Sequence, residues 1–390
     1  MDNLLIISSL TVLIMVSPFF SRLSGVSVAV VEIVLGSIAA FFGFLDSNDT
    51  LFNSIAKVGF LYLMFLAGLE VNLRDFATLK KPLWQRIALF FMVMYSLAMG
   101  LYITFELSPI YIIALPIVSV GMIITLIHEQ SDRSEWLSFA LTLGIVGELL
   151  SIFALTILSG FAQLGGFGFQ FVETMLMLCL VLVIAWLFFR VTSVLMWWFP
   201  HLKKLIMPDV GAMDEDVRVS IALFFVLTST MLYFGLELVL GAFMAGMFIS
   251  NFFEHKTDLA AKLGSFGFGF LVPFFFIFVG STLDLTLLTD LAVLRGALLI
   301  VLAMIALRIV ASFVAFRKLF SPKERLLVAL GESMPLTFLV AVATIGLRSE
   351  LLSTHEYSSF ILASMLEAVL VMVFIKLILG KKRTNHQKSL

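Results

Sequence analysis

A single carboxylate stands near the middle of a long apolar run. Glu148 is the only ionisable residue between Trp136 and Gly160. An ionised carboxylate at mid-bilayer depth is costly unless it is paired or protonated, so such residues usually serve function. We therefore expect Glu148 to bind a cation or a proton.

A second charge lies within another apolar run, ALLIVLAMIALRIVASFVAF, at Arg308. The most economical partner for this guanidinium is a buried carboxylate. Glu148 is the first candidate, and Glu367 or Glu332 are the alternatives. A permanent ion pair that only locks two helices is the competing interpretation, because a buried pair is weak support for function by itself.

Two prolines are placed symmetrically with respect to two of these acids. Pro116 precedes Glu148 by 32 residues, and Pro335 precedes Glu367 by the same 32. A mid-helix proline removes a backbone donor and frees a carbonyl, which in a membrane must face protein or water. A simple kink would explain either proline alone, but the matched pair predicts two broken helices that form an ion site. The residues expected beside the breaks are Ser119, Gly121, Glu332 and Thr337.

Composition fixes the class of protein that carries these residues. Hydrophobic residues make up 61% of the 390, charged residues 13%, and the mean hydropathy is +1.11. These values are typical of an all-α polytopic membrane protein. The net charge of −1 gives no basic field for nucleic acid, and the single cysteine, Cys179, excludes an intramolecular disulfide. All five histidines fall in expected loops or in the tail, so no enzyme site, cofactor site or Cys/His metal cluster is predicted.

The apolar segments predict about 13 membrane-spanning helices. They are expected near 3–20, 26–43, 55–72, 86–106, 109–127, 135–160, 170–198, 218–235, 237–252, 265–283, 290–316, 325–347 and 356–380.

Lys and Arg residues set the expected orientation, because cytoplasmic loops carry an excess of them. With the N-terminus outside, only Lys57, Arg295 and Arg348 among the loop cations fall outside. We therefore expect a multi-pass protein of the cell (inner) membrane with a basic cytoplasmic tail at 381–390.

The chain also repeats itself within one expected domain, 1–380. Glu32-Ile-Val-Leu-Gly36 recurs as Glu237-Leu-Val-Leu-Gly241, and the prolines continue the series. Repeats of about 26–160 and 237–380 would be separated by seven spans, an odd number, so the second is inverted as in secondary transporters. The helix near 170–198 links them. Counting the expected helices in order, helices 1–3 and 8–10 are assigned to a scaffold and helices 4–6 and 11–13 to a core.

Four motifs resemble those of one family, the monovalent cation/proton antiporters that include bacterial sodium/proton exchangers and the membrane part of Kef-type potassium efflux proteins. They are VVEIVLGSIAA, FLAGLEVNL, LGAFMAGMFIS and PFFFIFVGSTLDL. The resemblance implies broken fifth and twelfth helices, a homodimer and an elevator motion. It also implies that Glu148 is the ion-binding carboxylate and Arg308 the basic membrane residue. The family usually places Asn, Asp or Gln before the carboxylate, whereas this chain has Gly147.

These observations predict exchange of Na⁺ or K⁺ for protons, serving pH homeostasis, with Glu148 binding either ion and one-for-one exchange as the simplest stoichiometry. Glu367 could act as a second carrier. An ion-coupled transporter of a small anion on the same fold is the main alternative, since Arg308 and half-helix N-termini could hold an anion. A channel and a membrane sensor or scaffold are further alternatives.

Overall fold

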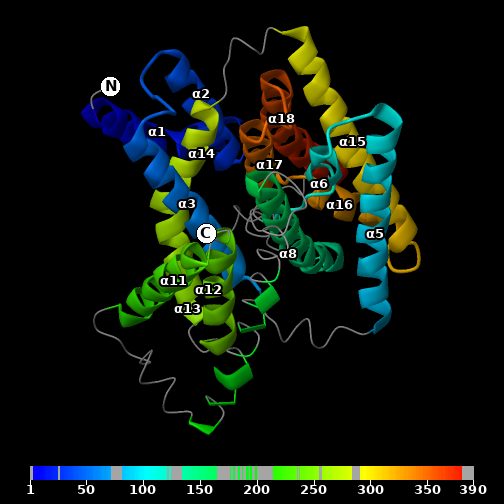
Figure 1. The fold of residues 1–390 in the computed structure, drawn as a ribbon, viewed down its shortest axis with the longest axis horizontal. Helices are drawn as coiled ribbons and strands as arrows, with labels where there is room; N and C mark the ends of the chain where they lie inside the picture. The colour runs from blue at the N-terminus through cyan, green and yellow to red at the C-terminus, as the bar shows by residue number, and fades with distance from the viewer. Residues whose placement is uncertain are drawn as a thin grey trace, which may run out of the picture. The chain divides into compact units, whose positions relative to one another are not determined.

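The computed structural model describes residues 3–24, 27–71, 81–120, 134–164, 214–234, 238–253, 257–282 and 290–379, with short pieces between them. Every regular element in these residues is helical (Figure 1). Eight of the described helices are long and apolar enough to cross a membrane, and three further apolar helices are shorter. The expected all-α membrane architecture is confirmed. The helix expected at 170–198 falls largely outside the described residues, and the tail at 381–390 falls entirely outside them.

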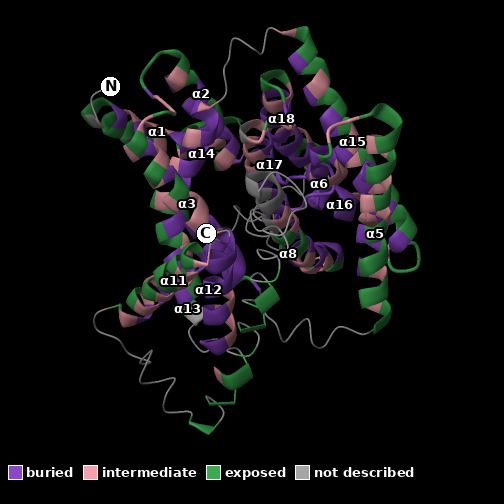
Figure 2. Cartoon of the chain, viewed as in Figure 1, coloured by how far each residue is buried: buried purple, intermediate pink, exposed green. Residues whose placement is uncertain are grey.

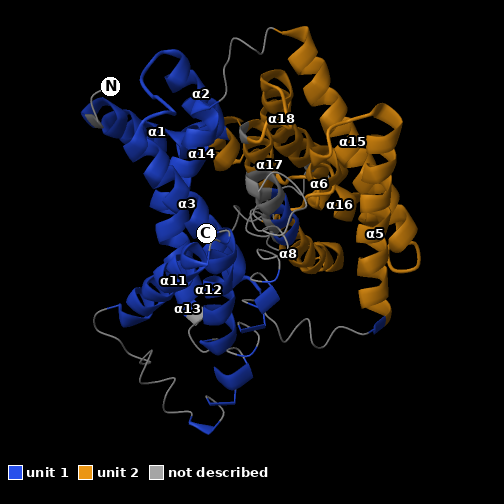
Figure 3. Ribbon diagram, in the orientation of Figure 1, with its two compact units in different colours: residues 1–20, 31–81, 152–285 blue, residues 21–30, 82–151, 286–390 orange. Residues whose placement is uncertain are grey.

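The chain divides into two compact units (Figure 3). Unit 1 consists of Met1–Phe20, Val31–Lys81 and Ile152–Leu285, and unit 2 consists of Ser21–Val30, Pro82–Ser151 and Thr286–Leu390. Each unit therefore combines segments from both halves of the sequence.

Unit 1 is built from helices that contain few charges. Its elements are α1 (Asn3–Ser24), α2 (Val28–Phe41), α3 (Thr50–Leu69), α11 (Glu215–Tyr233), α12 (Leu238–Phe252), α13 (Thr257–Phe266), the π-helical segment η1 (Gly267–Leu271) and α14 (Val272–Ser281). Residues of α1, α2, α3 and α14 form an apolar core around Phe52 and Ile277.

Glycines bring two pairs of these helices into backbone contact. A Cβ at Gly68 of α3 would collide with the Phe243 carbonyl of α12, and one at Gly246 of α12 would collide with the Phe65 carbonyl of α3. Gly36 of α2 and Gly280 of α14 are related in the same reciprocal way. Small residues at helix crossings are the usual means of close packing in membranes. The expected repeat relates α2 to α12 and α3 to α14, so it would convert one of these helix pairs into the other.

One expected boundary in unit 1 is displaced. The span expected at 265–283 begins earlier, because α13, η1 and α14 form one run in which 258–281 is apolar enough to cross a membrane. The glycine-rich stretch at 264–269 is thus helical, with a π-helical turn at its end. Gly267 lies against Tyr62 of α3, so close packing explains this glycine.

Unit 2 contains the long helices α5 (Lys81–Phe105), α15 (Leu291–Ala315) and α18 (Thr354–Leu379) and most of α8 (Glu135–Leu164). Between them lie three shorter helices, α6 (Ile110–Ala114), α16 (Pro322–Gly331) and α17 (Leu336–Arg348). α15 packs against α16 and α18, and α17 packs against α6 and α18. Helix α15 has buried residues on one side and exposed leucines and valines on the other, as expected for a helix that faces lipid (Figure 2).

Candidate ion-binding site

The sequence predicted helix breaks at both prolines. A described helix ends just before Pro116, and Pro335 lies between two helices. α6 ends at Ala114, and residues 115–120 are not helical. The second break separates α16 from α17 and consists of Glu332, Ser333, Met334 and Pro335. Pro116 and Pro335 are both buried within these breaks. Breaks of this kind leave backbone groups that need partners other than their own helix.

Arg308 supplies a partner to both breaks. This arginine of α15 is completely buried. Its Nε donates to the Glu332 carbonyl oxygen at 2.9 Å, and its Nη2 donates to the Ile117 carbonyl oxygen. Nη1 donates to the Met304 carbonyl one turn earlier, at 2.8 Å. The fork of a guanidinium carries five donors in one plane, which lets one side chain bond both interrupted segments.

Glu148 of α8 bonds the first break from another direction. Its Oε2 accepts the Val120 backbone N–H at 2.9 Å, while Oε1 has no hydrogen-bond partner among the described residues. One turn further along α8, the Ser151 hydroxyl accepts the Val118 N–H at 2.9 Å. Two donors released by the break are thus satisfied by α8, and one carboxylate oxygen remains available.

Two further carboxylates are completely buried beside Arg308. Glu367 Oε1 lies 4.0 Å from Arg308 Nη1. Glu332 lies within electrostatic range of both Arg308 and Glu148. None of the four carboxylate oxygens of Glu332 and Glu367 accepts a hydrogen bond from a described residue. The cluster therefore contains three acids, one base and five carboxylate oxygens without hydrogen bonds.

Most of the residues predicted for the site are in unit 2 and near one another. The structure brings Glu148, Arg308, Glu332, Glu367, Pro116 and Pro335 together, and buried Ser119 lies in the first break. The ion pair joins Arg308 to Glu367, an alternative partner in the sequence analysis, rather than to Glu148. Gly121 and the side chain of Thr337 lie outside the described residues.

Gly147 has a steric role in this arrangement. A Cβ at this position would lie 2.8 Å from the Val118 side chain and 3.0 Å from the Phe91 ring. Gly147 therefore lets α8 approach the first break closely enough for Glu148 and Ser151 to accept its N–H groups.

Two residues of the site, Ser151 and Gly144, were not identified from the sequence. Ser151 lies three residues after Glu148, a spacing that places both on one helix face, so its role could have been inferred. Gly144 lies one turn before Glu148, and a Cβ there would come within 3.4 Å of Glu332 Oε2. Nothing in the local sequence indicates that a residue some 190 positions away occupies this space.

The described residues contain no group of three or more His, Cys, Asp or Glu side chains arranged to hold a metal ion in the usual way. The cluster is instead suited to charge compensation. Three carboxylates and one guanidinium are completely buried in this part of unit 2, and uncompensated buried charge is strongly unfavourable. Protons or small cations on the carboxylates would restore the balance.

The chain is similar to known proteins over most of its length. A family model described as sodium/hydrogen exchanger, transmembrane, matches residues 7–381. The YjbQ protein of Bacillus subtilis is 25% identical over 385 residues, which cover 93% of this chain and 61% of that protein. A Methanocaldococcus jannaschii protein named "Probable Na(+)/H(+) antiporter 3" is 24% identical, with 93% of this chain and 92% of that protein covered.

The fold is also similar to a solved structure. It matches the sodium proton antiporter MjNhaP1 from Methanocaldococcus jannaschii, determined at pH 8, with a TM-score of 0.68 and 15% identity. The match covers 96% of each chain. Because the family model spans nearly the whole sequence, the chain belongs to the sodium/hydrogen exchanger family.

Proposed function

We propose that this protein is a secondary active transporter that exchanges a monovalent cation, Na⁺ or K⁺, for protons. The observation that carries the proposal is the set of five buried carboxylate oxygens, on Glu148, Glu332 and Glu367, that accept no hydrogen bond from the described residues. Arg308 can compensate one of three negative charges, so the remaining charge requires protons or cations. A site that must hold one or the other is the basis of exchange.

Glu148 is the proposed carrier of the exchanged ion. Its Oε1 is available, while Oε2 is held by the Val120 N–H in the first break. Glu367 lies next to Arg308, whose positive charge favours the ionised form of this carboxylate as the counter-charge of the arginine. If Glu332 stays protonated throughout, one cation exchanges for one proton.

Alternating access in this proposal is an elevator motion. Unit 2 carries the site and moves, while unit 1 serves as a scaffold and as the contact of a homodimer. The division of the chain into two compact units supports such a motion. A charged site is costly to move through a bilayer, so movement should require Glu148 to be neutralised by a proton or a cation. We place the protein in the cell (inner) membrane, with the N-terminus outside and the C-terminus in the cytoplasm.

The anion alternative is less favoured by the geometry. The unpaired groups of the cluster are carboxylate oxygens, which repel an anion, and the Arg308 donors named above already bond carbonyls. Uptake of a labelled organic anion would be needed to restore that alternative.

The test is exchange in proteoliposomes that contain a pH-sensitive dye and an imposed pH gradient. Pulses of Na⁺, K⁺ or Li⁺ should dissipate the gradient in the wild type, and the most effective ion identifies the substrate. Glu148→Gln should abolish this response. Glu32→Gln is the matched control, because Glu32 is also a buried membrane carboxylate, but lies in unit 1 and bonds Ser17 at 3.1 Å. Unaltered exchange in Glu148→Gln would refute the assignment of the carrier.

A further inference from the structure

A cavity lies in unit 2 where two membrane-spanning helices reach their ends. α5 begins at Lys81 and α15 ends at Ala315, and both are long and apolar enough to span a membrane. The cavity has a volume of about 350 Å³ and is lined by residues of the first turns of α5 and the last turns and C-terminal flank of α15. It therefore sits at the level of a membrane surface.

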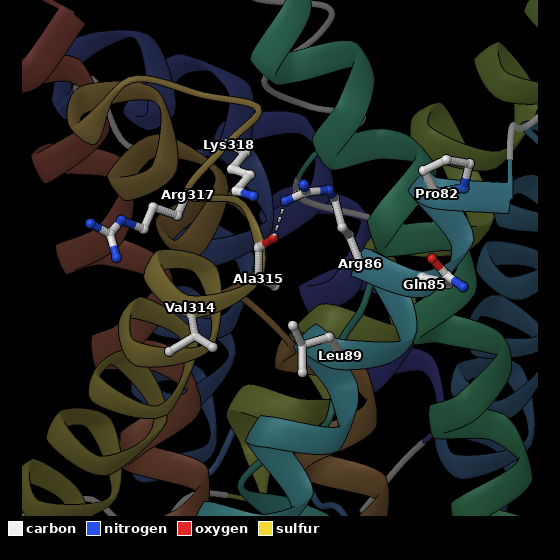
Figure 4. A pocket seen from close by; sticks show the side chains of 8 residues that line it. All are labelled: Pro82, Gln85, Arg86, Leu89, Val314, Ala315, Arg317 and Lys318. Atoms are coloured by element: carbon white, nitrogen blue, oxygen red, sulfur yellow. Dashed lines mark hydrogen bonds between the residues drawn. The ribbon is translucent and has the colours of Figure 1, made fainter.

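The polar side of this cavity is basic. Arg86 and Lys318 extend their charged ends toward each other across it, whereas the head of Arg317 points away (Figure 4). Arg86 is held in place, because its Nη1 donates to the Ala315 carbonyl oxygen at 3.0 Å. Among the described residues, none that lines the cavity is acidic. Two cations that face each other without a carboxylate are stabilised by an anion between them.

The remaining wall is apolar and open. Leu89 is 38% exposed and Val314 is 51% exposed, and both line the cavity. They belong to the faces of α5 and α15 that carry other exposed apolar residues, such as Met92 and Val310. A ligand with a phosphate and an attached hydrocarbon chain would match both the basic end and the apolar wall. A soluble anion would leave the apolar wall unused.

We propose that this cavity binds the headgroup phosphate of an anionic phospholipid, with Arg86 and Lys318 as its ligands and an acyl chain along Leu89 and Val314. Basic pockets between membrane helices on the cytoplasmic side commonly hold anionic lipid headgroups. The Lys and Arg distribution of the sequence predicts that this end of both helices lies in the cytoplasm. The proposal does not depend on which ion the protein exchanges.

The experiment is native mass spectrometry of the purified, delipidated full-length chain titrated with phosphatidylglycerol or phosphatidylcholine. We expect one phosphatidylglycerol to bind more tightly than the rest and more tightly than phosphatidylcholine. Lys318→Gln should weaken this first binding event about fivefold, as expected for loss of one cation near the membrane surface. Lys318→Glu should weaken it further, because a carboxylate beside Arg86 would occupy the place of the anion.

Arg317→Gln is the matched control. It removes the same charge from the neighbouring lining position, but the charged head of its side chain points away from Arg86 and Lys318 (Figure 4). We expect it to retain most of the preference for phosphatidylglycerol. If the Arg317 and Lys318 variants lost equal amounts of affinity for phosphatidylglycerol, the proposal would be overturned in favour of a diffuse effect of surface charge.

Inorganic phosphate at millimolar concentration tests whether the cavity binds free phosphate rather than the phosphate of a lipid headgroup. Phosphate should leave the bound lipid in place if the acyl chain contributes to binding. Displacement of the lipid by phosphate, or equal affinity for the two lipids, would show that the cavity is not a phospholipid site.

Discussion

The two units bury their polar groups in opposite ways. In unit 1, Gly68 and Gly246 let α3 and α12 meet backbone to backbone, and the buried acid Glu32 is hydrogen-bonded by Ser17. In unit 2, helices are interrupted, and buried carboxylates keep oxygens without hydrogen bonds. Closely packed backbones resist rearrangement, whereas unpaired acceptors attract ligands. The contrast supports the proposal that unit 1 is the rigid unit and unit 2 the one that binds the ion.

Arg308 should produce the largest effect, because it bonds both breaks of unit 2. Arg308→Met removes its hydrogen bonds to the Glu332 and Ile117 carbonyls and leaves Glu367 without its counter-charge. Loss of one member of a buried pair costs about 3–5 kcal/mol of unfolding free energy. We expect a strongly lowered thermal midpoint in detergent micelles and no exchange in proteoliposomes.

Arg308→Lys is the informative companion variant. It keeps the charge beside Glu367 but lacks the fork that reaches both carbonyls. We expect it to recover part of the stability and little of the exchange. Equal stability in the lysine variant and the wild type would mean that charge alone, rather than the bonds to the breaks, holds unit 2 together.

The glycine contacts of unit 1 should give an intermediate effect. Gly246→Ala places a methyl group against the Phe65 carbonyl, which cannot move without shifting α3. Overpacking of this kind costs about 1–3 kcal/mol. Gly264→Ala is the control, because a Cβ at this helical position meets nothing within 4 Å, so it should be neutral or slightly stabilising. Equal losses of thermal stability in the two variants would contradict the assigned role of backbone contact.

The smallest effect is expected at the bonded acid of unit 1. Ser17→Ala removes the hydroxyl that donates to Glu32 Oε1 and should cost about 1 kcal/mol, the typical net value of a hydrogen bond. Exchange should remain near the wild-type rate when measured at a temperature where the variant is folded. A loss of exchange as complete as in Glu148→Gln would remove the functional distinction between the units.

The sequence was most informative where a residue type has few uses in a membrane. Pro116 and Pro335 predicted the non-helical segments in which they lie. Glu148 and Arg308 were identified by their charge within apolar runs, and Glu367 by its spacing from Pro335. Their pairing was harder to predict, because the partner of Arg308 depends on which helices are neighbours. α15 packs against α18, which brings Glu367 rather than Glu148 to the arginine. Spacing along the chain contains no such information.

Gly147 illustrates a different limit. The family resemblance implied a polar residue at this position, so Gly147 was noted in the sequence only as a departure from that pattern. In the structure it provides the space that lets Val118 approach α8. A glycine can be explained only when the atoms that would collide with its missing side chain are known.

Arg308 bonds both breaks, but it is synthesised long after the first of them. The Val118 and Val120 amides find acceptors on side chains only 33 and 28 residues away. The Ile117 carbonyl, however, is bonded by a residue 191 positions later, which the ribosome has not yet made when the first half enters the membrane. The Val118 and Val120 N–H groups can therefore be bonded early in synthesis, whereas the Ile117 carbonyl is bonded only after Arg308 has been made. Completion of the site is tied to the arrival of the second half, so a chain truncated before Arg308 would leave the Ile117 carbonyl without this donor.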